Sequence, residues 1–171
     1  ELVALAKAKG CYFAVGNIER NNPVVASLRS VVESGALGQL VHLNGLRAGG
    51  FPRNVKTGNN VVLDLAVHEL DVFRMLLGPL EVTHAFGHCS QEPGIYDTAE
   101  IIVHADNGAT GTVHVNWLTP QRMRSIRVTG KAGLCHVDYL SQTCELVGHN
   151  LREKTGHLPI QWHQEANSLE R

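Results

Sequence analysis

The spacing of apolar and polar residues divides the chain into two parts. From residue 81 onward, apolar and polar positions alternate in short runs, which is typical of β-strands that bury one face. Turn sequences such as Asp-Asn-Gly at 106–108 and Gly-Lys-Ala-Gly at 130–133 separate these runs. This part of the chain therefore predicts about six strands in an open, mainly antiparallel β-sheet.

Helical spacing dominates before residue 81. The segment 22–38 places valine and leucine on one helical stripe, with an asparagine cap and a proline at its start. The segment 39–49 alternates like a strand, and the segment 59–78 is an almost unbroken apolar helix that a Gly-Pro pair ends. Because the apolar face of the sheet needs cover, we expect an α+β fold whose helices cover one face.

The two ends of the chain carry a different pattern. Residues 1–10 have the spacing of an amphipathic helix that ends at a glycine, and residues 11–16, "CYFAVG", have the composition of a short buried strand. A helix that leads into a strand is half of an α/β unit. We therefore expect residues 1–16 to be the remnant of a preceding α/β domain and residues 17–171 to form a second domain. Residues 163–171 look like a helix that stops early, so we interpret the chain as a fragment.

Composition and charge exclude several classes of partner. The chain has 15 basic and 16 acidic residues, so it has no net field that would attract nucleic acid or an anionic membrane surface. Its apolar runs are shorter than the ~20 residues that span a bilayer. Four scattered cysteines without a CxxC pair indicate reduced thiols in a cytoplasmic protein. We expect neither nucleic acid nor membrane as a partner.

Candidate chemistry lies in the apolar helix 59–78, which contains Asp64, His68 and Asp71. Residues four apart lie above one another on a helix, so Asp64 and His68 face the same way. Three interpretations stay open at this point. Asp64 and His68 satisfy one another, or Asp64 caps the helix; Asp64 orients an imidazole that accepts a proton; or all three residues bind a metal ion.

Four segments occur in an order that points to one family. They are "VGNIERNNP", "LRAGGFPRN", "VVLDLAVHELDVFRMLLG" and "NWLTPQRMRSIRVTGKAG". Together they resemble the C-terminal substrate domain of the glucose–fructose oxidoreductase / inositol dehydrogenase / MocA family, over nearly the whole chain. They look most similar to its UDP-N-acetylglucosamine 3-dehydrogenase branch.

The resemblance implies an NAD(P)-dependent enzyme that oxidises or reduces a hydroxyl-bearing carbon of a sugar. His68 would be the general base that takes the hydroxyl proton, and Asp64 would orient His68 or hydrogen-bond the substrate, without a metal ion. Asn17 stands where the family usually has a histidine, which would alter a substrate contact. The sequence has no GxGxxG motif and no Glu-Lys-Pro segment, so NAD or NADP would be bound mainly by a domain absent from this chain. The fragment alone is expected to be inactive.

Arginines in loops at the strand ends are candidates for substrate binding. Arg20, Arg47 and Arg53 lie in such loops, and paired guanidinium N–H groups suit the diphosphate of a nucleotide-sugar. The alternative is that these arginines are solvated or pair with nearby acids: Glu19, Asp64 or Glu69. Near a later Thr-Pro turn, Trp117, Arg122 and Arg124 are further candidates for the wall of a sugar site, although a strand tryptophan is more often core.

The uncovered face of the predicted sheet suggests a partner. Along "GTVHVNWL" one face is apolar, whereas the other mixes polar and apolar side chains. Such a mixed face often meets another subunit, so we expect a homodimer or homotetramer formed through it. A second functional class stays open, which is a stand-alone sugar-binding or oligomerisation module without catalysis. The presence of both Asp64 and His68 favours the enzyme.

Overall fold

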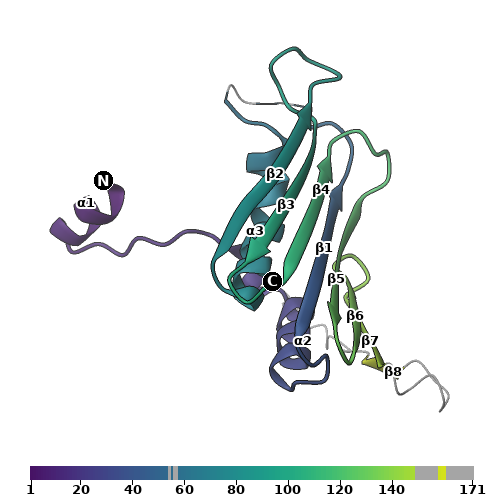
Figure 1. Cartoon of the computed structure of the whole chain (residues 1–171). Helices are drawn as coiled ribbons and strands as arrows, with labels where there is room; N and C mark the ends of the chain where they lie inside the picture. Colours follow the sequence, from purple (N-terminus) through teal and green to yellow (C-terminus); the bar gives the residue numbers. More distant parts are fainter. Residues whose placement is uncertain (54, 56–57, 149–157, 161–171) are drawn as a thin grey trace, which may run out of the picture.

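The computed structural model of the chain describes residues 1–53, 55, 58–148 and 158–160 (Figure 1). Its helical elements are α1 (Leu2–Ala8), the 3₁₀ turn η1 (Ile18–Asn21), α2 (Pro23–Glu33), the π-helical turn η2 (Val62–Ala66) and α3 (Val67–Leu77). Its strands are β1 (Leu40–Ala48), β2 (Leu80–His88), β3 (Thr98–Ala105), β4 (Thr110–Asn116), β5 (Met123–Gly130), β6 (Gly133–Asp138), β7 (Thr143–Gly148) and β8 (Leu158–Ile160).

The strands that the structure describes form one sheet, in the order β2-β3-β4-β1-β5-β6-β7-β8. Neighbouring strands are antiparallel except β1 and β4, which run parallel. The α+β fold with an open, mainly antiparallel sheet is therefore confirmed. Strands β2 to β7 are the six expected after residue 81, and β1 is the strand expected at 39–49. The alternation of residues predicts neither β8 nor the parallel pairing of β1 with β4.

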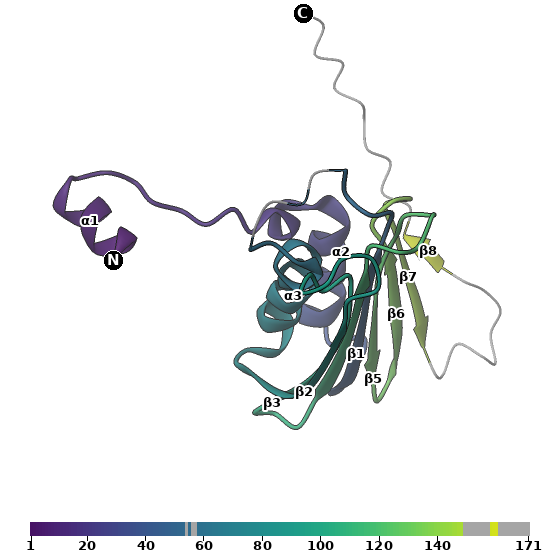
Figure 2. The same ribbon diagram turned by 90° about the horizontal axis from the view of Figure 1, so that it is seen from above.

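Helices α2 and α3 lie on the same face of the sheet, as both views show (Figures 1 and 2). Helix α2 contacts β6 and β7, while α3 contacts β1 and β4. Their buried stripes and the inner face of the strands form one apolar core, which includes Leu28, Phe73 and Val113. No helix in the described ranges is long and apolar enough to cross a membrane.

The start of α2 follows directly from its sequence. The side chain of Asn22 accepts a hydrogen bond from the backbone N–H of Val24 at 3.2 Å, and Pro23 occupies the first helical position. Leu28 and Val31 lie on the buried stripe that this start creates. The asparagine cap expected at the start of this helix is therefore confirmed, and the residue that forms it is Asn22.

Helix α3 approaches the sheet closely because two strands place glycine beneath it. A Cβ on Gly45 of β1 would lie 3.3 Å from Glu69 Cβ and from Phe73 Cζ. A Cβ on Gly111 of β4 would lie only 2.8 Å from the Phe73 ring, which is fully buried. The two glycines therefore set how near to the sheet the first turn of α3, with His68, can lie.

The N-terminal segment differs from its prediction at one point. Residues 2–8 form α1 as expected, but residues 11–16 form no strand, and Tyr12, Phe13 and Val15 are exposed. The buried strand expected at 11–16 is therefore wrong for this chain. A strand needs a neighbour for its backbone N–H and C=O groups, and no described strand lies beside this segment (Figures 1 and 2). The helix expected at 163–171 lies outside the described residues.

We predict that Gly111→Ala destabilises the fold by about 1–3 kcal/mol, because the added methyl group overpacks the buried Phe73 ring. The measurement is the urea midpoint of unfolding at an unchanged denaturant slope. Gly50→Ala is the control, since a Cβ there would meet no atom within 4 Å, and it should change stability by no more than about 0.5 kcal/mol. Equal midpoints for the two variants would show that α3 does not depend on this close approach.

Candidate active site

An asparagine cap and a π-helical turn position Asp64 and His68. The Asn60 side-chain oxygen accepts hydrogen bonds from the backbone N–H groups of Val62 and Leu63, at 3.0 and 3.1 Å. Asn60 therefore caps this helix, and the interpretation of Asp64 as its cap is wrong. The π-helical turn η2 follows, and it occurs before α3 begins at Val67. Turns of this kind are frequent at functional sites.

Asp64 and His68 line the same cavity, whose volume is about 380 Å³. The cavity lies where the end of β1 and the start of β5 meet η2 and α3, and its size is in the range of small-molecule sites. The other residues around it are Ile18, Arg47, Ala48, Gly49, Gly50, Pro52, Leu65, Trp117, Arg122 and Arg124. The structure thus brings the predicted acid and imidazole together.

Trp117, rather than His68, holds the Asp64 carboxylate. The indole Nε1 donates a hydrogen bond to Asp64 Oδ2 at 3.1 Å, and Phe51 packs edge-on against the indole with ring centroids 5.5 Å apart. Within the described residues no hydrogen bond joins Asp64 to His68. Asp64 therefore acts on the imidazole through its charge, and the direct pair that the sequence suggested does not form.

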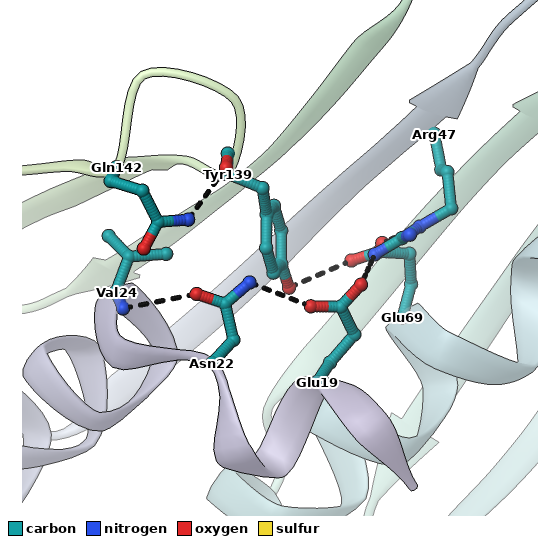
Figure 3. Close-up of polar contacts among 7 residues, drawn as sticks. All are labelled: Glu19, Asn22, Val24, Arg47, Glu69, Tyr139 and Gln142. Carbon is teal, nitrogen blue, oxygen red and sulfur yellow. Dashed lines mark hydrogen bonds and ion pairs between the residues drawn. The ribbon is translucent and has the colours of Figure 1, made fainter. Parts of the chain in front are cut away.

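Arg47, which lines the cavity, belongs to a buried ion-pair network, and Figure 3 shows this network. Arg47 is only 2% exposed, and it donates from Nε to Glu69 Oε1 at 2.5 Å and from Nη2 to Glu19 Oε1 at 2.8 Å. The Tyr139 hydroxyl donates to Glu69 Oε2 at 3.3 Å, and the Asn22 amide donates to Glu19 Oε2 at 2.9 Å. One guanidinium thus joins carboxylates from η1 and α3 to strand β1.

Burial and charge determine the protonation of this network. Burial raises the pKa of Glu69, and the second carboxylate, Glu19, adds to this rise although Arg47 opposes it. Burial also opposes the charge on Arg47, but Glu69 and Glu19 outweigh it and raise the pKa of the guanidinium. For Glu19, hydrogen bonds from Asn22 and Arg47 outweigh burial and lower its pKa. Of the two carboxylates, Glu69 is therefore the easier to protonate.

His68 is held in its neutral form by the same surroundings. Burial and then the positive charge of Arg47 lower the pKa of His68, with Glu19 and Asp64 opposing. No side chain or backbone group in the described ranges forms a hydrogen bond with its ring nitrogens. A neutral imidazole that faces a cavity can accept a proton from a hydroxyl group.

Three of the four polar residues predicted for substrate binding, Asn17, Arg20 and Arg47, have protein partners. Arg20 donates to both Asp71 oxygens at 2.7 Å, and Asn17 donates to Asp71 Oδ1 at 3.1 Å. Arg53 is exposed in the loop after β1 and does not line the cavity. Among the three predicted arginines, Arg47 reaches the cavity, but it pairs with Glu19 and Glu69, the alternative left open by the sequence.

Sequence reasoning left Glu69 only as one of several possible partners of an arginine, and it missed the second partner of Glu69, Tyr139. The available signal was an acid on the apolar stripe of α3, since Glu69 precedes Val72 and Phe73 by three and four residues. An acid at such a position requires a partner inside the protein. Within the described ranges, no group of three or more histidine, cysteine, aspartate or glutamate side chains is arranged to hold a metal ion.

Comparison with known proteins gives both sequence and fold relatives. A family model described as "GFO/IDH/MocA C-terminal domain" matches residues 25–136. An inositol 2-dehydrogenase of Corynebacterium glutamicum (strain R) is 31% identical over 114 residues, which cover 61% of this chain and 32% of that protein.

Solved structures share the fold. UDP-N-acetylglucosamine 3-dehydrogenase GnnA from Acidithiobacillus ferrooxidans has a TM-score of 0.77 at 21% identity, over 95% of this chain and 50% of that one. A levoglucosan dehydrogenase in complex with NADH and L-sorbose has a TM-score of 0.78 at 16% identity, over 89% of this chain and 47% of that one. This chain thus spans about half, or less, of the length of these proteins.

We predict that Arg47→Met lowers the free energy of unfolding by about 3–5 kcal/mol, because two buried carboxylates lose their cation. The measurement is urea unfolding within a double-mutant cycle that adds Glu69→Gln. The double variant should lose clearly less than the sum of the single losses. Arg20→Met is the matched control, since the Arg20 side chain is 43% exposed in its pair with Asp71, and it should lose far less. Additive losses would mean that Arg47 and Glu69 contribute independently.

Proposed function

This chain belongs to the GFO/IDH/MocA family, and we propose that the whole protein is an NAD- or NADP-dependent oxidoreductase that acts on a hydroxyl-bearing carbon of a sugar or related polyol. The observation that carries the proposal is a neutral histidine, His68, in one cavity with the carboxylate of Asp64. The relative named inositol 2-dehydrogenase supports a polyhydroxylated substrate. A more specific version of this proposal is that the substrate is a nucleotide-sugar.

In the proposed reaction the hydroxyl O–H and the C–H bond of the same carbon break, and a C=O bond forms. His68 accepts the hydroxyl proton, and a nicotinamide held by another domain would take the hydride. Asp64, fixed by Trp117, places its negative charge near the imidazolium that forms and stabilises it. In the reverse direction His68 returns the proton to the oxygen.

The described residues do not fit the pyrophosphate of the cofactor. That group needs free N–H groups in a glycine-rich turn before a helix. At α2 the N–H of Val24 already donates to the Asn22 side chain. At η2 the N–H groups of Val62 and Leu63 already donate to Asn60. We therefore assign NAD or NADP binding mainly to a domain outside this chain. Residues 1–16 would be the end of that domain, and residues 17–171 the substrate domain.

The alternative is a sugar-binding or oligomerisation module without catalysis. Its support is the set of protein partners that Asn17, Arg20 and Arg47 already have, because such pairs stabilise a fold without any chemistry. The enzyme is favoured because His68 has no such partner in the described residues and faces the cavity. A cytoplasmic location belongs to the proposal, and the four free cysteines support it.

We predict that His68→Ala in the complete protein lowers kcat by about 10²–10⁴-fold, because the proton acceptor is lost. Turnover is measured with NAD and NADP on myo-inositol and on UDP-N-acetylglucosamine. His136→Ala on β6, which points to the opposite face of the sheet, should retain normal turnover. Near-normal turnover by His68→Ala would remove the base assignment.

The same assignment predicts the acid limb of the pH profile. His68 must be neutral to act, and its pKa is lowered, so kcat/KM should fall only at pH values below the ordinary histidine value of about 6.5. The stability of the fold is expected to change with pH in the same direction. The unfolded chain protonates this histidine first as pH falls, so the folded state loses stability below about pH 6.5 and incurs no such loss above it.

We also propose that the uncovered sheet face forms a homodimer or homotetramer contact. On this face Phe86 and Ile102 are 69% and 38% exposed. Beside them Glu100 pairs with His114. This mixture of exposed apolar side chains and an ion pair supports an interface.

Phe86→Glu should shift the complete protein towards monomers, raising the dimer dissociation constant by roughly tenfold or more. Sedimentation equilibrium provides the measurement, and Lys131→Glu in the turn after β5 serves as control. An unchanged mass distribution for Phe86→Glu would place any self-association on another surface.

A further inference from the structure

We infer that Arg124, at the start of β5, and Arg122, just before this strand, form an anion-binding subsite in the cavity of His68. This subsite takes a carboxylate or phosphate group carried by the substrate. This inference rests on the function proposed above and adds a substrate class to it. It assigns anion recognition to these two residues instead of Arg20 and Arg53. Neither Arg20, which pairs with Asp71, nor Arg53 lines the cavity.

The sheet places two like charges side by side. Arg124 of β5 is the direct partner of Arg47 in the antiparallel pairing with β1, and both side chains line the cavity. Like charges in direct cross-strand positions destabilise a sheet. Arg47 is compensated by Glu19 and Glu69, whereas no described carboxylate forms an ion pair with Arg124. The charge of Arg124 is thus left unbalanced beside the cavity.

The surroundings of Arg124 oppose its charge. The side chain is half-buried, and burial together with the positive charges of Arg47 and Arg122 lowers its pKa, against weaker effects of Glu19 and Glu69. Its backbone is fixed, because the Tyr139 N–H donates to the Arg124 carbonyl at 3.0 Å. An anion bound here would relieve the repulsion and would accept hydrogen bonds from a guanidinium whose strand is fixed in position.

Arg122 extends the positive charge to the mouth of the cavity. It is exposed, and its Cγ lies 3.8 Å from the position of a Cβ on Gly49, which places it over the end of β1. The acid of this cavity, Asp64, is turned to Trp117. A substrate that presents a hydroxyl to His68 therefore has a cationic wall available for a second group. A neutral sugar has no negative charge to balance two guanidinium groups. Carboxylate and phosphate groups supply this charge, and their oxygens match the paired N–H donors.

The test uses three probes that differ in one group at the same carbon: D-glucose, D-glucuronate and D-glucose 6-phosphate. Isothermal titration calorimetry on the complete protein measures the affinity of each. We expect one anionic probe to bind at least about tenfold more tightly than glucose, and Arg124→Met to remove this preference while glucose affinity stays within about twofold. Which anionic probe is preferred distinguishes a carboxylate from a phosphate. Arg122→Met should cause a smaller loss, and Arg74→Met, an exposed arginine outside the cavity, none.

Two outcomes overturn the inference. The first is a wild-type protein that does not prefer either anion, including one that binds none of the three probes. The second is an Arg124→Met variant that keeps the preference or unfolds, because unfolding would show that the guanidinium has a structural partner. A normal or raised melting temperature of this variant is the expected control result, since a like-charge contact is removed.

This test does not depend on turnover. If His68→Ala keeps its activity while anion preference still requires Arg124, the proposed base is wrong and the subsite remains. If His68→Ala is inactive while Arg124→Met binds the probes like the wild type, the proposed enzyme remains and the subsite is wrong.

Discussion

One buried guanidinium connects the parts of the chain that form the cavity. Arg47 of β1 holds Glu19 of η1 and Glu69 of α3, and all three side chains are at least nine-tenths buried. Moving charges out of water costs several kcal/mol each, and this cost is offset only while every partner is present. The network therefore ties η1 and α3 to the sheet in one arrangement. Since His68 is next to Glu69 in the chain, the position of the candidate base depends on this arrangement.

The same network links stability to proton chemistry. Arg47 fixes Glu69, and its positive charge adds to burial in lowering the pKa of the neighbouring His68 imidazole. Because two carboxylates share this one cation, the network itself adds no net positive charge to the cavity. The positive character of the cavity wall therefore comes from Arg124 and Arg122, which are not compensated in the described residues. Arg47 and Arg124 face each other on adjacent strands, yet of the two only Arg47 is fully buried and has acidic partners among the described residues.

Local sequence patterns predict most of the fold, but they do not predict which residues or strands that are distant in sequence pair with one another. Alternation predicts β1 to β7, and the cap at Asn22 follows from sequence because a cap involves neighbouring residues. The parallel pairing of β1 with β4 depends on how the chain returns to the sheet, so no local pattern contains it. The same holds for Arg47. Its type and position suggest either a phosphate ligand or an acidic partner, and only the folded structure shows that the partners are Glu19 and Glu69, 28 and 22 residues away. The π-helical turn also leaves no signal in the apolar run that contains it.

The position of β1 in the sheet has a consequence for the order of folding. This strand comes first along the chain, yet it lies in the middle of the sheet between β4 and β5. The later hairpins can form from residues close in sequence, but β1 gains both neighbours only after long loops close, and such contacts form slowly. The cavity contains Arg47 from β1, Trp117 from the end of β4 and Arg124 from β5. We therefore expect the cavity to be assembled late, so that a partly folded chain with intact hairpins would still have no place to bind a substrate.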